Sequence, residues 1–175
     1  MAEALGMLFR YCINSPGELA TLAQELDNVH HYLLIQRYRY GDRFTYEEHI
    51  ENEDVMDSSL PVMTLQPLVE NALYHGIKKK RGGGTILIEG KLEGNKILLK
   101  VIDNGKGMTE QELARLRRYI AGCEDGGKQG FGLGNVNQRI HRYYGEEYGI
   151  FFESEENRGT EAVIIIPAKI IEQKS

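Results

Sequence analysis

The sequence has 175 residues, of which 41% are hydrophobic and 27% charged, enough for one domain with a hydrophobic core and an additional helix. A net charge of −5 argues against a nucleic-acid-binding surface, because phosphate backbones attract a clustered basic excess. No run approaches the roughly 20 apolar residues of a membrane span, and Cys12 and Cys123 lack partners at metal-ligand or disulfide spacing, which favours a reduced, cytosolic setting without membrane contact.

The first 40 residues are predicted to be mainly helical. Apolar residues within 5–12 share one helical face, and the Asn-Ser-Pro-Gly run at 14–17 interrupts it. A second helix is predicted over 19–40, where apolar residues recur mostly every three or four positions. This stripe needs a partner. Packing on the following domain is one interpretation, and dimerisation is the other.

The next segment predicts a strand, a loop and a helix. Residues 44–50 alternate as a strand does, and 51–59 form an acidic loop. A helix then opens at Pro61 or Thr64 and is ended by the glycine-containing run at 76–84.

Two strands follow, over 85–90 and 96–102, and the turn residues 92–95 join them as a hairpin. Asp103 is therefore expected at the end of a strand.

The last third predicts one more helix, a loop and a second helix. Thr109 and Glu112 have the spacing of a capping box, which opens a helix that ends near Ala121. Residues 122–129 are glycine-rich without periodicity and are interpreted as a lid. A helix is predicted over 134–144.

Strands over 148–154 and 160–166, joined by a turn at 157–159, complete the pattern. Hairpin-linked strands with few helices predict an α+β domain, a two-layer α/β sandwich in which helices cover one face of a mixed, mostly antiparallel sheet.

Three polar and glycine clusters carry the functional signal. Residues 65–76 put Asn71 on a helix whose polar face, positions 67, 71, 74, 75 and 78, can line a pocket. Residues 103–108 place a carboxylate beside two glycines at a strand end, and 130–135 form a glycine loop that can bring backbone N–H groups near phosphates. Together they indicate a nucleotide pocket. Position 135 is Asn and no Gly-Lys-Ser/Thr occurs, which excludes the Rossmann and P-loop motifs.

The three clusters resemble the N, G1 and G2 boxes of the ATPase superfamily that contains gyrase, MutL and the histidine kinases. The first box, Leu-Gln-Pro-Leu-Val-Glu-Asn-Ala followed by His-Gly, is closer to the autolysin-regulating and sugar-sensing (LytS/YesM-like) sensor histidine kinases, and the string from Leu26 to Phe44 fits that subgroup too. The resemblance implies a Bergerat-type ATP-binding fold. We expect a helical lead-in over 1–40, the catalytic domain over 41–170 and a tail over 171–175, as the cytosolic end of a membrane-anchored sensor.

This resemblance implies ATP and Mg²⁺ as ligands. Asn71 would give an oxygen to Mg²⁺, and the Asp103 carboxylate would accept a hydrogen bond from the adenine amine and so reject guanine. Further residues are expected to contact the nucleotide: His75, Lys78, Gly105, Gly107, Met108, Gly130, Phe131, Gly132, Leu133, Gly134 and Thr160.

The role of Glu70 is less determined. It can serve as a general base in catalysis, or it can pair with a surface cation. In the gyrase-like relatives the carboxylate that activates water lies one helical turn before the Asn, and Pro67 occupies that position here. This departure argues against a dedicated hydrolase.

The acceptor histidine of the kinases lies in a Pro-His-Phe motif, which this sequence lacks. We therefore expect an ATP-binding kinase domain that transfers the γ-phosphoryl group to a histidine outside this chain, in a homodimer, for relay to an aspartate of a response regulator. A gyrase- or MutL-like ATPase clamp and a non-catalytic nucleotide-binding module are the alternatives. Five histidines do not match the motif: His30, His31, His49, His75 and His141.

Overall fold

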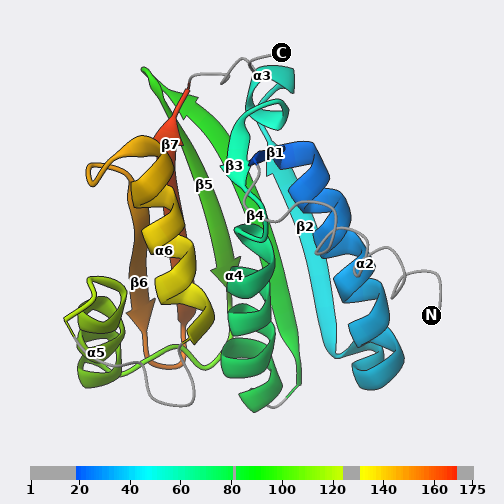
Figure 1. The fold of residues 1–175 in the computed structure, drawn as a ribbon. Helices are drawn as coiled ribbons and strands as arrows, with labels where there is room; N and C mark the ends of the chain where they lie inside the picture. Colours follow the sequence, from blue (N-terminus) through cyan, green and yellow to red (C-terminus); the bar gives the residue numbers. More distant parts are fainter. Residues whose placement is uncertain (1–18, 81, 124–130, 169–175) are drawn as a thin grey trace.

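A computed structural model describes residues 19–80, 82–123 and 131–168. Within these residues, five strands form one mixed sheet, and the helices lie on one of its faces (Figure 1). Neighbouring strands are antiparallel except for the parallel pair β2 and β4. The predicted two-layer sandwich is confirmed. The order across the sheet is β2 (Phe44–Ile50), β4 (Gly84–Glu93), β5 (Lys96–Asp103), β7 (Gly159–Pro167) and β6 (Gly149–Glu155).

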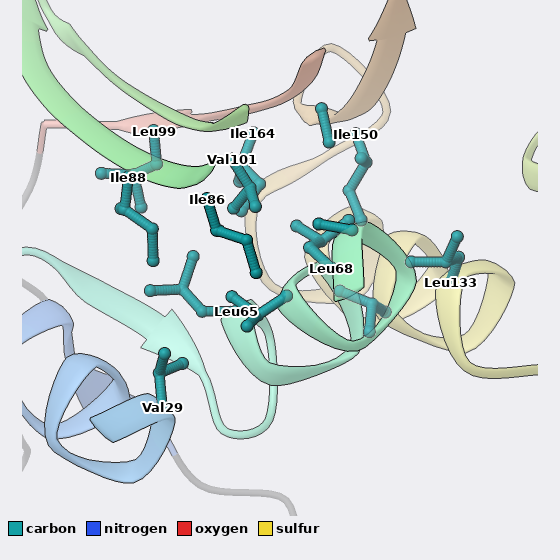
Figure 2. Packing of buried hydrophobic residues seen from close by; sticks show 14 of the residues in the cluster. Val29, Leu65, Leu68, Ile86, Ile88, Leu99, Val101, Leu133, Ile150 and Ile164 are labelled. Carbon is teal, nitrogen blue, oxygen red and sulfur yellow. The ribbon is translucent and has the colours of Figure 1, made fainter. Parts of the chain in front are cut away.

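The core lies between this sheet and the helices α2 (Leu22–Tyr40), α4 (Leu65–Asn71) and α6 (Phe131–Tyr144). Figure 2 shows Val29, Leu68 and Leu133, one from each helix, which belong to one buried cluster with apolar side chains of the sheet. Burial of this apolar surface is the main stabilising term of the fold.

The predicted strands are confirmed, with small extensions. The hairpin of β4 and β5 is confirmed, but its turn is shorter than the predicted 92–95, because Glu93 pairs with Lys96; Asp103 is the last residue of β5. Pro67 lies in the first turn of α4, where its missing N–H costs little.

The second predicted helix begins three residues later than expected. Thr21 caps it: its hydroxyl accepts the N–H of Gln24 at 3.2 Å, and Gln24 Oε1 accepts the N–H of Thr21 at 2.9 Å. The residues before the cap form β1 (Leu19–Thr21), which pairs with β3 (Ser59–Pro61). The apolar stripe of α2, including Leu22 and Val29, is buried in the same core as the sheet, so these residues pack on the domain.

The acidic stretch over 51–59 is not only a loop. It contains α3 (Glu53–Met56), because Asn52 Oδ1 accepts the N–H of Val55 at 3.0 Å and Val55 is fully buried. A local cap and one apolar anchor were enough to make a helical turn where composition alone predicted none.

Two other helices differ from the prediction at their ends. After α4 the chain continues through a π-helical turn, η2 (Ala72–Gly76), and a 3₁₀ turn, η3 (Ile77–Lys79), so the helix extends past Gly76. Helix α6 starts at Phe131 rather than at 134, which puts Gly132 inside its first turn.

The capping box of α5 (Glu110–Ile120) is confirmed: Thr109 Oγ1 accepts the N–H of Glu112 at 3.3 Å, and Glu112 Oε2 accepts the N–H of Thr109 at 2.8 Å. The predicted lid over 122–129 lies almost entirely outside the described residues, as do the tail over 171–175 and the first predicted helix. In the described part of the chain, no helix combines the length and the apolar character needed to cross a membrane.

Candidate functional site

A cleft of about 190 Å³ opens between α4 with its π-helical extension η2 on one side and the start of α6 on the other. These elements converge at the end of the molecule toward which α4 runs and from which α6 begins (Figure 1). Four of the five predicted polar-face positions, 67, 71, 74 and 75, line the cleft. Its full lining is Pro67, Glu70, Asn71, Tyr74, His75, Gly132 and Leu133.

Lys78 lies elsewhere. Its ammonium group lies 5.6 Å from the ring centroid of Tyr40 and 5.4 Å from that of Tyr74, on the side of η3 that faces α2. Lys80 is the lysine of this run that approaches the second box, because its Nζ donates to the backbone oxygen of Asn104 at 2.5 Å. Lys78 is the lysine expected at the site, whereas the structure brings the side chain of Lys80 to the second box.

Asp103 is buried, with 4% of its surface exposed, at the end of β5. Its Oδ1 accepts the N–H of Gly105 at 2.8 Å, and the backbone N–H of Thr160, its register partner on β7, also donates to the carboxylate. Burial raises the pKa of Asp103 to about 6, against the lowering effect of these two donors and of Lys80. An ionised carboxylate has about four acceptor positions, so two backbone donors leave capacity for a ligand donor.

Gly76 and Gly105 allow the first and second boxes to touch. A Cβ on Gly76 would lie 2.3 Å from Asp103 Oδ1, and one on Gly105 would lie 2.2 Å from the carbonyl carbon of Gly76. The N–H of Lys106 donates to the oxygen of Gly76 at 3.1 Å. The turn after Asn71 is therefore fixed directly against the buried carboxylate.

Replacing Gly76 with alanine should separate these two boxes. Gly76 has an ordinary helical φ of −82°, so the added methyl group is excluded by the carboxylate and not by backbone strain. We expect the free energy of unfolding to fall by about 1–3 kcal/mol, as overpacking costs, and ATP affinity to fall at least tenfold. Chemical denaturation and calorimetric titration measure the two. Gly94→Ala is the control for affinity: at a φ of +61° alanine is strained and lowers stability, but nothing lies within 4 Å of the added methyl group, so ATP affinity should be unchanged.

The rest of the second box is held against the β6–β7 turn. Gly107 has a φ of +66°, and a Cβ there would lie 2.0 Å from the backbone oxygen of Glu155. The N–H of Met108 donates to Ser154 Oγ at 2.9 Å, and Ser154 Oγ lies 3.0 Å from Thr160 Oγ1. Ser154 thus joins two predicted site residues, although no motif in the sequence identified it.

The third box is described in part. Gly130 and the side chain of Phe131 lie outside the described part of the chain. Gly132 lines the cleft opposite Pro67, where an added Cβ would make an ordinary 3.6 Å contact. A Cβ on Gly134 would lie 2.9 Å from the Tyr119 hydroxyl, so this glycine allows α5 and α6 to pack. Leu133 is largely buried and lines the cleft.

Glu70 lies beside Asn71 on the cleft wall, and its Oε1 accepts a hydrogen bond from Gln66 Nε2 at 2.9 Å. Asn71 offers one amide oxygen, which suits Mg²⁺ when phosphates and waters supply the remaining ligands. The residues present therefore fit a magnesium nucleotide: Asn71 lines the cleft as a neutral oxygen donor, and the buried acceptor Asp103 lies against Gly76, in the turn that follows Asn71.

The pH dependence of stability should report the burial of Asp103. Because its pKa is raised from the usual 3.8 to about 6, the folded protein binds this proton more tightly than the unfolded chain. The resulting stabilisation is complete below pH 4 and is lost as the pH rises through about 6. We expect the free energy of unfolding of Asp103→Asn, measured by urea denaturation at each pH, to lack this pH-dependent stabilisation. Parallel pH profiles of the two proteins would contradict it.

Comparison with known proteins identifies the family to which this chain belongs. The family described as histidine kinase-, DNA gyrase B-, and HSP90-like ATPase matches residues 56–170, and the histidine kinase family matches residues 1–44. The chain is 36% identical over 97% of its length to sensor histidine kinase YesM of Bacillus subtilis, and 33% identical over 97% to sensor protein LytS of Bacillus anthracis. It spans 27% and 28% of those relatives.

Solved structures share the fold. A catalytic domain of histidine kinase ThkA superposes with a TM-score of 0.62 at 17% identity, over 87% of this chain and 98% of that one. The mycobacterial sensor histidine kinase MprB gives 0.58 at 18% identity, over 87% and 97%. The chain therefore belongs to the family of histidine kinase-, DNA gyrase B- and HSP90-like ATPases, and within it is similar to sensor histidine kinases of the LytS and YesM type.

Proposed function

We propose that this domain binds ATP with Mg²⁺ and, in its intact protein, transfers the γ-phosphoryl group to a histidine side chain. The observation that carries the proposal is the buried Asp103 carboxylate, with acceptor capacity to spare, fixed against the turn that follows Asn71. A carboxylate in that position accepts from the exocyclic amine of adenine, whereas guanine presents a carbonyl oxygen there.

The remaining roles follow from the cleft. Asn71 would hold Mg²⁺ through its amide oxygen, and His75 and Gly132, which line the same cleft, would face the phosphates. Backbone N–H groups in the first turn of a helix favour negative charge, and Gly132 lies in the first turn of α6. When bound, the metal neutralises charge on the transferring phosphoryl group. Met108, Gly105, Gly107 and Thr160 shape the base end.

The partners follow from the relatives. We propose an acceptor helix of the intact kinase, homodimerisation through it, and relay of the phosphoryl group to an aspartate of a response regulator. The similar proteins named sensor kinases favour a domain on the cytosolic side of a membrane-anchored protein.

The test is phosphotransfer. The chain is incubated with ATP labelled at the γ-phosphate, Mg²⁺ and the acceptor-helix domain of its own kinase. We expect acid-labile, base-stable label on the acceptor, none with GTP, and none when the acceptor histidine is replaced by glutamine. Release of free phosphate without transfer would favour an ATPase clamp. Binding without either reaction would favour a non-catalytic module.

A further inference from the structure

We infer that Asn28 and Gln66 are positioning residues that aim the Glu70 carboxylate into the cleft. This inference deepens the proposed function and rests on it. Helix α2 then belongs to the machinery of the site, although it lies outside the residues matched by the ATPase family.

The geometry is a chain of two hydrogen bonds that runs from α2 to the cleft wall. Asn28 Nδ2 donates to Gln66 Oε1 at 2.7 Å, and Gln66 Nε2 donates to Glu70 Oε1 at 2.9 Å. Asn28 and Gln66 are buried, with 4% and 8% of their surfaces exposed, while Glu70 lines the cleft beside Asn71. Few waters can compete for the two buried amides, so the chain has one stable arrangement.

The direction of the chain follows from chemistry. An ionised carboxylate only accepts hydrogen bonds, so Gln66 must turn its NH₂ group toward Glu70. Its oxygen must then face Asn28, which must donate. An amide at each of positions 28 and 66 satisfies both contacts. A carboxylate at position 28 could only accept, so it would draw the NH₂ group of Gln66 away from Glu70.

Helix α2 is held in register for this contact. One turn before Asn28, the Glu25 carboxylate accepts the N–H groups of Met63, Thr64 and Leu65 at 2.7–2.8 Å. Glu25 and Asn28 lie three residues apart and therefore share one face of α2, the face toward α4. The start of α4 cannot slide along α2 while these bonds hold, so Asn28 stays opposite Gln66.

A Glu70 carboxylate fixed on the cleft wall can act as a proton acceptor. As a nitrogen of the acceptor imidazole bonds to the γ-phosphorus and the bond from phosphorus to the ADP oxygen breaks, the imidazole gives up a proton. Glu70 would receive it, with Gln66 holding the carboxylate in place. Asn28 and Gln66 then act through Glu70 and touch neither nucleotide nor acceptor.

The experiment measures phosphotransfer by the intact kinase carrying Gln66→Met or Asn28→Asp. Asn28→Asp is nearly isosteric; it turns the Gln66 amide over and presents an oxygen to Glu70. We expect kcat to fall about tenfold or more in each variant, within the range that general-base catalysis contributes, with KM for ATP changed less than about threefold. Gln111→Met and Asn95→Asp make the same chemical changes at exposed positions and should leave both constants unchanged.

Dependence on Glu70 is tested by a double variant. If Gln66 acts through Glu70, then Gln66→Met together with Glu70→Gln is no slower than Glu70→Gln alone. Additive losses, or a raised KM with unchanged kcat, would overturn the inference.

A second readout does not depend on kinase activity. In the nucleotide-free chain, the ¹³C resonance of the Glu70 carboxylate should shift in Asn28→Asp and Gln66→Met and stay in place in Asn95→Asp. An unmoved resonance would overturn the positioning role even in an active kinase. If the two variants show the shifts but the wild-type chain neither binds MgATP nor transfers phosphate, the proposed function and the proton-acceptor role are overturned, and the hydrogen-bond chain stands.

Discussion

Asp103→Asn should lower the affinity for ATP by about a hundredfold and leave the domain folded. The asparagine NH₂ group must face either the backbone donors of Gly105 and Thr160 or the adenine amine, and it can accept from neither. Losing a buried hydrogen bond to a charged group costs about 1.5–3 kcal/mol, and about 1.4 kcal/mol is a factor of ten in affinity.

Calorimetric titration of MgATP into both proteins measures this loss. GTP serves as the specificity ligand, because guanine has an acceptor oxygen where adenine has its amine, so the variant should discriminate less between the two nucleotides. Asp57→Asn, at an exposed position after α3, is the matched control and should bind as wild type does. Equal ATP affinity in wild type and Asp103→Asn would mean that the base is recognised elsewhere.

The position of Asp103 could be predicted because the evidence for it is local. Alternating residues over β4 and β5, joined by a short turn, fix where β5 ends. The polar face of α4 follows in the same way from helical periodicity, and the structure brings four of its five positions to one cleft. Lys78 is the exception, because the π-helical turn η2 shifts the residues after it out of the α-helical pattern.

The contacts made by α2 could not be predicted from the sequence. A glutamate, an asparagine and a tyrosine within an apolar stripe are typical of a helix with a partly exposed face, yet Glu25, Asn28 and Tyr32 are all buried. The partners of Glu25 and Asn28 lie about 40 residues away and come close only when α2 packs beside α4, so no spacing rule indicates them. The same reason hid Ser154, whose partner Met108 lies 46 residues away in the second box.

Glu25→Ala should be the most destabilising single change on α2, lowering the free energy of unfolding by about 3–5 kcal/mol. Thr64 precedes α4 but does not cap it, since its hydroxyl donates to Pro61 instead. The cap is supplied by Glu25, whose two carboxylate oxygens accept three backbone N–H groups. Alanine leaves these donors without the acceptor in a site where Glu25 itself is fully buried. Urea denaturation measures the loss.

Glu25→Gln separates the charge from the shape of this cap. The amide oxygen of the glutamine can still accept a hydrogen bond, but its NH₂ group faces backbone donors. We therefore expect the free energy of unfolding to fall by about half as much as in Glu25→Ala. Asp27→Ala, on the exposed side of the same helix, removes only a surface pair with His31 and should cost at most about 1 kcal/mol. If Glu25→Ala cost no more than Asp27→Ala, water would be replacing the carboxylate at the start of α4. Helix α2 would then contribute packing alone, and its register against the cleft would have to be set by the apolar contacts of Leu22, Leu26 and Val29.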